Sequence, residues 1–163
     1  MPATIDTALL RALRTRWHGR RAERGVLAFT RLGEHGGLWF ALAAAGAAID
    51  EDRRPLFARA AASIASAYAV NQLIKLAVGR RRPNLADLPP LVRTGTQISY
   101  PSAHSTTSFA GARSLAGVVP AAAVPLYLAA AAMALSRPYV GVHYPSDVVA
   151  GAALGTAVAE LAA

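Results

Sequence analysis

Runs of apolar residues separated by short polar segments make up most of the chain after residue 37. The runs are rich in alanine and leucine and show no alternation of β-branched and polar residues, so they predict helices rather than strands. Their approximate positions are 38–49, 60–78, 104–119, 120–135 and 147–161. A membrane span needs ~20 apolar residues, a length that the segment from 56 to 78 reaches and that 38–49 does not.

The first 35 residues have a different pattern. Between residues 4 and 17 an apolar residue recurs every four positions, and arginines lie off this stripe. The stripe consists of Ile5, Leu9, Leu13 and Trp17. It predicts a basic amphipathic helix, which suits two roles equally: lying on an anionic lipid surface, or packing on the core as an ordinary surface helix. We expect a basic break at 19–24 and a second short helix at about 25–32.

These elements predict an all-α fold, a membrane-embedded helical bundle of about five core helices preceded by an N-terminal amphipathic helical part. A chain of 163 residues suits one domain, which we divide into an amphipathic segment, 1–35, and a helical core, 36–163. Because successive core helices run antiparallel, the loops at 75–104 and 137–147 are expected at the same end of the bundle. No secretory signal peptide is expected, since arginines spread to residue 31.

Composition narrows the class of partner. The formal net charge is +8, which favours either nucleic acid or an anionic membrane. The chain is 54% hydrophobic and only 7% aromatic, and its apolar segments lack the basic polar face of a nucleic-acid module. We therefore expect a membrane as partner and no nucleic acid. The absence of cysteine excludes disulfides and cysteine metal sites.

Three short motifs carry the candidate chemistry. They are Lys75-x6-Arg82-Pro83, Pro101-Ser102-Ala103-His104 and Ser136-Arg137-x5-His143-x3-Asp147. The third motif places an arginine, a histidine and an aspartate in one short turn between two apolar runs. A histidine that attacks phosphorus needs a cation to hold the substrate and a carboxylate to orient the imidazole, and this turn provides both. Lys75 is the only lysine in the chain, the other sixteen cations being arginines.

At these motifs the chain resembles the type-2 phosphatidic acid phosphatase superfamily, whose pattern is K-x6-R-P, P-S-G-H and S-R-x5-H-x3-D in this order. The resemblance covers residues 75–147 and departs at one position, where Ala103 stands in place of the family's usual glycine. Alanine adds only a methyl group where φ is ordinary, but it is strained where φ is positive. We expect activity to survive this change.

The resemblance implies a role for each motif residue. His143 is the implied nucleophile, which forms a phosphohistidine, and Asp147 holds the other ring nitrogen. His104 is the implied general acid for the leaving oxygen and afterwards activates water. The implied phosphate-binding groups are Lys75, Arg82, Arg137, Ser102 and the backbone around Ala103. No metal and no cofactor is implied, since no carboxylate cluster with metal-ligand geometry lies near the motifs.

We expect the other polar residues near the motifs to have structural or membrane-surface roles rather than catalytic ones. Asn71, one helical turn before Lys75, is expected to support that lysine. Glu34 and His35 fall in a turn on the same side as the motifs, and we interpret them as interfacial rather than catalytic. We interpret His18 as incidental. The basic residues interpreted as a membrane-surface cluster are Arg80, Arg81 and Arg93.

Together these features predict a small integral membrane phosphatase, independent of metals, that acts on a phosphate monoester or diphosphate carried by a lipid. High arginine and alanine content is typical of GC-rich bacteria, and the chain is similar to small actinobacterial family members, including those that remove the 5-phosphate from decaprenylphosphoryl phosphoribose. A polyprenyl-linked phosphosugar is therefore the favoured substrate. The alternatives are undecaprenyl diphosphate, phosphatidylglycerophosphate or phosphatidate as substrate, and a catalytically silent membrane-surface binding protein. The haloperoxidases of the same family are larger and soluble, so this short apolar chain disfavours haloperoxidase activity.

The distribution of charge predicts which side of the membrane holds the site. Seven arginines fall between residues 11 and 31, which we place on the active-site side. The opposite side has Arg53, Arg54 and Arg59, and their charge is offset by the acidic residues at 50–52. The positive-inside rule then places the active site at the cytoplasmic face of the cell membrane.

Overall fold

The computed structural model describes residues 4–16 and 18–162, and within these ranges its regular elements are helices. In chain order they are α1 (Ile5–Thr15), α2 (Arg20–Leu32), η1 (Glu34–Gly36), α3 (Gly37–Ile49), α4 (Arg54–Val78), α5 (Ala103–Val118), η2 (Pro120–Ala122), α6 (Ala123–Tyr139) and α7 (Pro145–Leu161). The only strand-like pairing among the described residues is an isolated bridge between Arg81 and Ile98. The all-α prediction is confirmed, with α3 to α7 as its five core helices.

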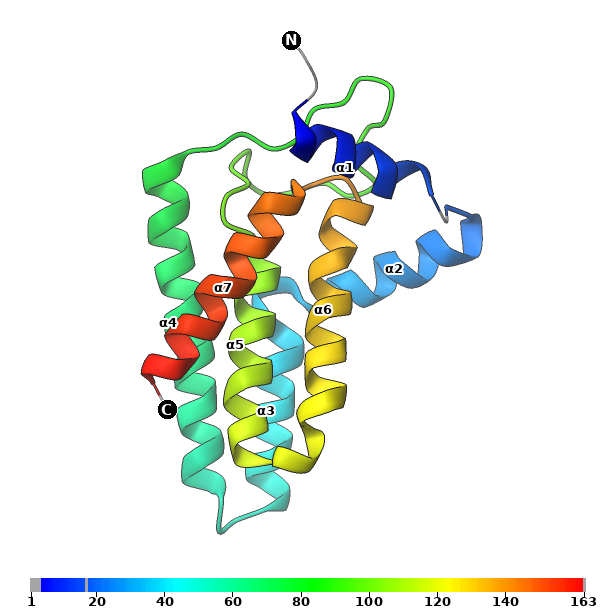
Figure 1. Ribbon diagram of the computed structural model, residues 1–163. Coiled ribbons are helices and arrows are strands. Elements are labelled where there is room, and N and C mark those ends of the chain that lie inside the picture. The colour runs from blue at the N-terminus through cyan, green and yellow to red at the C-terminus, as the bar shows by residue number, and fades with distance from the viewer. Residues whose placement is uncertain (1–3, 17, 163) are drawn as a thin grey trace.

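The five core helices form one bundle, and α1 lies across one end of it (Figure 1). The α3–α4 and α5–α6 turns lie at the opposite end, while the long α4–α5 loop and the α6–α7 link lie beside α1. Helix α2 runs obliquely from the side of the bundle toward α6, against which it packs. The antiparallel order therefore brings the three motifs to the α1 end, as the sequence predicts.

Helix α5 is the centre of the bundle and packs against α4, α6 and α7. Two glycines four residues apart let α7 approach it closely, as small residues do at helix interfaces in membranes. A Cβ atom at Gly155 would lie 2.1 Å from the carbonyl oxygen of Thr106, and one at Gly151 would lie 2.5 Å from that of Ser102. The amide of Ser102 also donates to the carbonyl of Asp147 at 2.9 Å. These contacts fix the first turn of α7 against the first turn of α5.

Two helical segments of the described chain are long and apolar enough to cross a membrane, Arg54–Val78 and Pro120–Tyr139. In each segment only 28% of the most apolar 18-residue stretch is buried, whereas a core helix of a soluble protein is mostly buried. Leu73, Leu128 and Val149 are each about two-thirds exposed on different helices (68%, 66% and 68%). Apolar side chains spread around the outside of a bundle suit contact with lipid. Helix α3 has only 13 residues, as expected from its short apolar run.

The boundaries of three helices differ from the sequence prediction. Helix α2 begins at Arg20, so the expected break at 19–24 is wrong: arginine, alanine and glutamate favour helix, and Gly25 costs too little to end it. Helix α6 continues through Pro138, because a proline in the last turn removes only one helical hydrogen bond. Helix α7 begins at Pro145, two residues before its apolar run at 147, and has Tyr144 as its N-cap.

The face of helix α1 that packs on the bundle is not the face that carries its apolar stripe. The buried residues are Leu10 and Arg14, while Ile5 and Leu9 are 82% and 51% exposed. Arg14 is held by two carbonyl oxygens, those of Pro89 at 2.7 Å and Tyr139 at 3.2 Å. The helix therefore packs on the bundle mainly through polar contacts and leaves part of its apolar stripe outside. Trp17, the last member of the stripe, lies outside the described residues.

Candidate active site

A cavity of about 330 Å³ opens at the end of the bundle where the three motifs meet. Its walls come from η1, α4, α5, α6 and the two motif loops. The lining residues from the predicted site are Lys75, Arg82, Ala103, His104, Arg137 and His143. Asp147 lies behind the cavity wall, against His143. Ser102 does not line the cavity, because its buried hydroxyl caps α5 by accepting from the amide of Ser105 at 3.4 Å.

His143 is held by groups on both sides of its ring. Nδ1 lies 3.5 Å from Asp147 Oδ2, within ion-pair range but long for a hydrogen bond, and Nε2 lies 3.1 Å from Arg82 Nη1. Asp147 occupies the third position of α7, where Oδ2 accepts from the amide of Tyr144 at 2.8 Å. Its Oδ1 accepts from Arg80 Nη1, also at 2.8 Å. The carboxylate is thus fixed on one side of the imidazole, and Nε2 faces the cavity.

The surroundings of His143 favour its neutral form. Burial is the largest cause that lowers the pKa of this imidazole from its ordinary value of 6.5. The hydrogen-bonding carboxylate of Asp147 raises that pKa, and the nearby charges of Arg82, Arg137 and Lys75 lower it further. We therefore expect a neutral ring at physiological pH. With its proton on Nδ1, beside the carboxylate, the ring has its lone pair on Nε2, which lies at the cavity and accepts from Arg82 Nη1 at 3.1 Å.

Two of the three predicted phosphate-binding cations at the cavity are buried with unused hydrogen-bonding capacity. Arg137 donates from Nη1 to Thr30 Oγ1 at 2.6 Å, but its buried Nε has no hydrogen-bond partner among the described residues. Lys75 has one acceptor, the carbonyl of Ser99, at 3.5 Å, although an ammonium group has three donors. Arg82 donates from Nε to the carbonyl of Thr96 at 2.8 Å. Cations with free donors beside a cavity form a site for an anion.

His104 stands at the start of α5 and lines the cavity. Its Nε2 lies 3.2 Å from the carbonyl oxygen of Thr30, which can only accept, so this nitrogen carries the hydrogen. Ala103 is the first residue of α5, and its φ is not among the positive values of the described chain. Alanine is therefore unstrained at the position where the family usually has glycine.

The structure brings three residues into the site that the sequence analysis did not select. Thr30, in the last turn of α2, is 2% exposed and contacts both His104 and Arg137. Arg80 binds the carboxylate of Asp147 and does not belong to a surface cluster, in contrast to the prediction. Asp6 of α1 binds Arg80 in turn. The sequence around Thr30 and Asp6 does not indicate that they belong to the site, because their contacts join segments more than 70 residues apart in the chain.

Other predictions about neighbouring residues have mixed outcomes. Asn71 does not contact Lys75: its Nδ2 donates to Thr106 Oγ1 at 2.9 Å and joins α4 to α5 instead. Glu34, His35 and Arg93 line the cavity. His35 pairs with Tyr68, whose hydroxyl lies 3.1 Å from its Nδ1. His18 lies outside the cavity and stacks on Tyr139. Arg81 is exposed on the surface.

Across residues 4–16 and 18–162, no group of three or more His, Cys, Asp or Glu side chains is placed to hold a metal ion. The positive charge beside the cavity comes from Lys75 and from three arginines, Arg82, Arg93 and Arg137. Lysine and arginine side chains bind phosphate oxygens directly.

Comparison with known proteins identifies the family. The model of the PAP2 superfamily matches residues 56–163, which include every motif. The decaprenylphosphoryl-5-phosphoribose phosphatase of Mycolicibacterium smegmatis is 43% identical over 131 residues, covering 78% of this chain and 69% of that protein.

Solved structures agree on the fold. The crystal structure of Aquifex aeolicus LpxE matches with a TM-score of 0.84 and 23% identity, over 98% of this chain and 94% of that one. A transmembrane PAP2-type phosphatidylglycerolphosphate phosphatase from Bacillus subtilis matches with a TM-score of 0.78 and 22% identity, over 96% and 82%. The chain therefore belongs to the PAP2 superfamily and is an integral membrane phosphatase.

Proposed function

We propose that this lipid phosphate phosphatase acts on a polyprenyl-linked phosphosugar and works through a phosphohistidine intermediate. The observation that carries the proposal is the cavity wall, where the unprotonated Nε2 of His143 faces the same space as donors of Arg137 and Lys75 that lack good partners. A phosphoryl group bound there satisfies the donors and places its phosphorus in front of the nucleophile.

The first step transfers the phosphoryl group to the enzyme. His143 Nε2 forms a bond to phosphorus while the bond from phosphorus to the leaving oxygen breaks, and the electron pair goes to that oxygen. His104 enters this step as an imidazolium with protons on both ring nitrogens. It keeps the hydrogen on Nε2 and gives the proton on Nδ1 to the oxygen, so the product leaves as an alcohol. Asp147 stabilises the positive charge that develops on the imidazole by holding the hydrogen on Nδ1.

The second step returns the enzyme to its starting state. His104, now neutral, removes a proton from water, and the water oxygen attacks phosphorus. The bond between phosphorus and Nε2 breaks, its electron pair returns to the ring, and inorganic phosphate leaves. Lys75, Arg82 and Arg137 bind the three non-bridging oxygens in both steps. Ser102 acts indirectly, by capping α5, whose first two residues, Ala103 and His104, line the cavity at the N-terminus of the helix.

The rim of the cavity supports a sugar as the group next to the phosphate. Glu34 and Gln72 line the cavity, with Tyr68 and His35 forming a polar pair beside them. These four side chains offer both hydrogen-bond donors and acceptors to hydroxyl groups. A phosphosugar has hydroxyl groups next to its phosphate, and a phosphatidate has none there. The similar mycobacterial protein is named for a phosphoribose substrate. Leu76, one residue beyond Lys75, is 73% exposed and offers apolar surface to a lipid chain.

The preferred substrate can be measured by phosphate release in detergent with EDTA, comparing a polyprenyl-phosphosugar phosphate, a polyprenyl diphosphate and phosphatidate. We expect the phosphosugar to react fastest. Gln72→Ala should lower kcat/KM about 2- to 10-fold for the phosphosugar alone, because one hydrogen bond to a hydroxyl is lost. Gln97→Ala, an exposed glutamine outside this cavity, is the matched control. Equal rates on phosphatidate, or loss of activity in EDTA that magnesium restores, would contradict the proposal.

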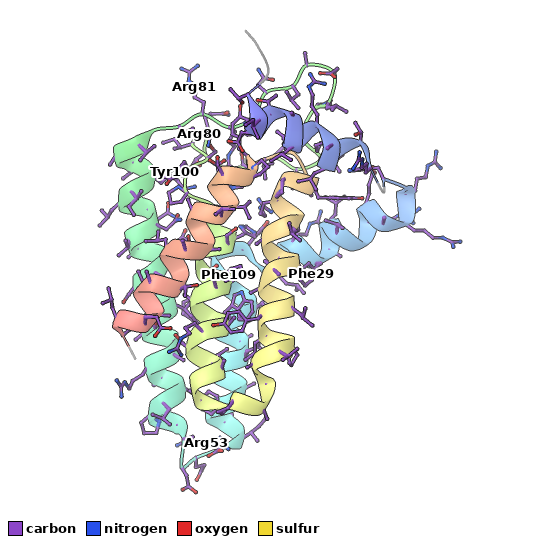
Figure 2. The ribbon with its side chains drawn as sticks, in the orientation of Figure 1. Phe29, Arg53, Arg80, Arg81, Tyr100 and Phe109 are labelled. Carbon is purple, nitrogen blue, oxygen red and sulfur yellow. The ribbon has the colours of Figure 1, made fainter. Side chains whose placement is uncertain are left out.

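We place the active site at the cytoplasmic face of the cell membrane. Figure 2 shows Arg53 at the far end of the bundle from Arg80 and Arg81. At the far end Arg53 and Arg54 are each paired with an acidic residue, Asp50 and Glu51, so little net positive charge remains there. The active-site end has the arginine-rich α1 and α2. The positive-inside rule therefore favours the cytoplasm for this end.

Single cysteines test this orientation cleanly, because the chain has none of its own. In right-side-out membrane vesicles, a membrane-impermeant maleimide should label Asp52→Cys at the far end but not Asn84→Cys in the α4–α5 loop. Both positions are exposed. Permeabilised vesicles should show labelling at both sites. Labelling of residue 84 alone in intact vesicles would reverse the orientation.

A further inference from the structure

Arg80 lies two residues after the last residue of α4, and Figure 2 shows it beside the ends of α1 and α7. Helix α4 ends at Gly79, whose positive φ of 63° turns the chain back over the bundle. The next three residues pair with residues 97–99 of the α4–α5 loop through the antiparallel bridge between Arg81 and Ile98. The amide of Arg82 donates to the carbonyl of Gln97 at 3.0 Å, and the amide of Ser99 donates to the carbonyl of Arg80 at 2.7 Å. Because side chains alternate in extended backbone, Arg80 and Arg82 point inward and Arg81 points to solvent.

The guanidinium of Arg80 joins two carboxylates from opposite ends of the chain. Nη1 donates to Asp147 Oδ1 at 2.8 Å and to Ser146 Oγ at 2.7 Å, and Nη2 donates to Asp6 Oδ2 at 2.7 Å. The plane of the group lies over the ring of Tyr144, 4.1 Å from its centre. Asp6 also accepts from the amide of Ser146 at 3.0 Å. The first turn of α1 is thereby bound to the first turn of α7.

These contacts determine the orientation of the carboxylate that faces the nucleophile. The side chain of Asp147 is fully buried, and Arg80 donates the one hydrogen bond that its Oδ1 accepts within the described chain. Oδ2 is left for the amide of Tyr144 and for His143 Nδ1. A buried carboxylate that loses a charged donor is costly and reorients toward other partners. Removing Arg80 would therefore free Asp147 to turn away from the imidazole.

We infer that Asp6 and Arg80 are positioning residues for the phosphoryl-transfer step, and that helix α1 thereby belongs to the catalytic apparatus. This inference rests on the proposed function of His143 as nucleophile. Neither residue touches the cavity, so neither binds substrate. Their effect passes through Asp147 and appears in the rate of chemistry. Asp6 lies outside the region matched by the family model, residues 56–163, so α1 contributes to the site from beyond that region.

The test compares steady-state kinetics of variants with a water-soluble ester, p-nitrophenyl phosphate, and with the lipid substrate. Arg80→Ala should lower kcat about 10- to 100-fold, as for other groups that orient a reactive side chain, with KM unchanged. Asp6→Asn keeps the shape of the side chain and should lower kcat about tenfold through the weakened bond to Arg80. Arg80→Lys keeps one charged contact and should restore part of the loss of Arg80→Ala.

A double-mutant cycle separates positioning from two independent effects. If Asp6 acts through Arg80, the double variant Asp6→Asn with Arg80→Ala should be no slower than Arg80→Ala alone, because residues of one network are not additive. Independent, multiplying losses would overturn the inference. An increase in KM with an unchanged kcat in these variants would also overturn the inference.

Two matched controls address the stability of the fold and the docking of α1. Arg81→Ala removes the same charge from the neighbouring exposed arginine and should leave kcat unchanged. Asp87→Asn breaks another ion pair of α1, the one with Arg11, without touching a site residue. If Asp87→Asn slows the enzyme as much as Asp6→Asn does, general docking of α1 explains both, and the inference fails. If the wild-type protein hydrolyses none of the substrates, that result would instead count against the proposed function.

Discussion

Replacement of His143 by alanine is expected to reduce phosphate release by about 10⁴-fold or more, because a covalent mechanism has no route without its nucleophile. The alanine leaves the three cations in place, so substrate should still bind. The measurement is phosphate release in detergent with EDTA. Wild-type enzyme quenched during turnover of radiolabelled substrate should also contain an acid-labile, base-stable phosphohistidine, and the variant should contain none.

The control for this experiment is His18→Ala, which removes the imidazole that stacks on Tyr139 outside the cavity. This variant should form the phosphoenzyme at the wild-type rate. Retention of substantial turnover by His143→Ala would mean that water attacks the substrate directly. Phosphohistidine in that variant would identify another histidine as the nucleophile, and His104 is the other histidine with a predicted catalytic role that lines the cavity.

The sequence predicts the centre of this site well because its residues are fixed by short-range geometry. His143 and Asp147 are four residues apart across the start of a helix, a spacing that places them in contact whatever the rest of the fold does. Lys75 and Arg82 flank the end of α4. The antiparallel order of apolar runs then brings both segments to one end of the bundle.

The surrounding residues depend on how distant helices dock, which the sequence pattern does not encode. Three consecutive arginines look alike in the sequence, but the turn at Gly79 and the extended backbone after it direct Arg80 inward and Arg81 outward. The face of α1 is a similar case. Its periodicity selects the stripe that begins at Ile5, yet the polar contacts of Arg14 with distant carbonyls decide which side is buried.

The effect of replacing His104 by glutamine should depend on the leaving group of the substrate. A general acid contributes about 10²- to 10⁴-fold, and only where the departing oxygen needs a proton. The alcohol released from a lipid phosphate is such a case, so the variant should be slowed by this amount. The p-nitrophenolate ion is a weak base that leaves without a proton, so transfer of the phosphoryl group from p-nitrophenyl phosphate to His143 should be nearly as fast as in the wild-type enzyme.

The same substitution removes the group that activates water in the second step, so the phosphohistidine should accumulate. With p-nitrophenyl phosphate this predicts a burst of nitrophenolate equal to the enzyme concentration, followed by slow turnover. His35→Gln, in the rim of the same cavity, is the matched control and should show no burst. The proton-transfer role requires this dependence on leaving group. An equal loss on both substrates, without a burst, would instead assign His104 to positioning, through its hydrogen bond with the carbonyl of Thr30.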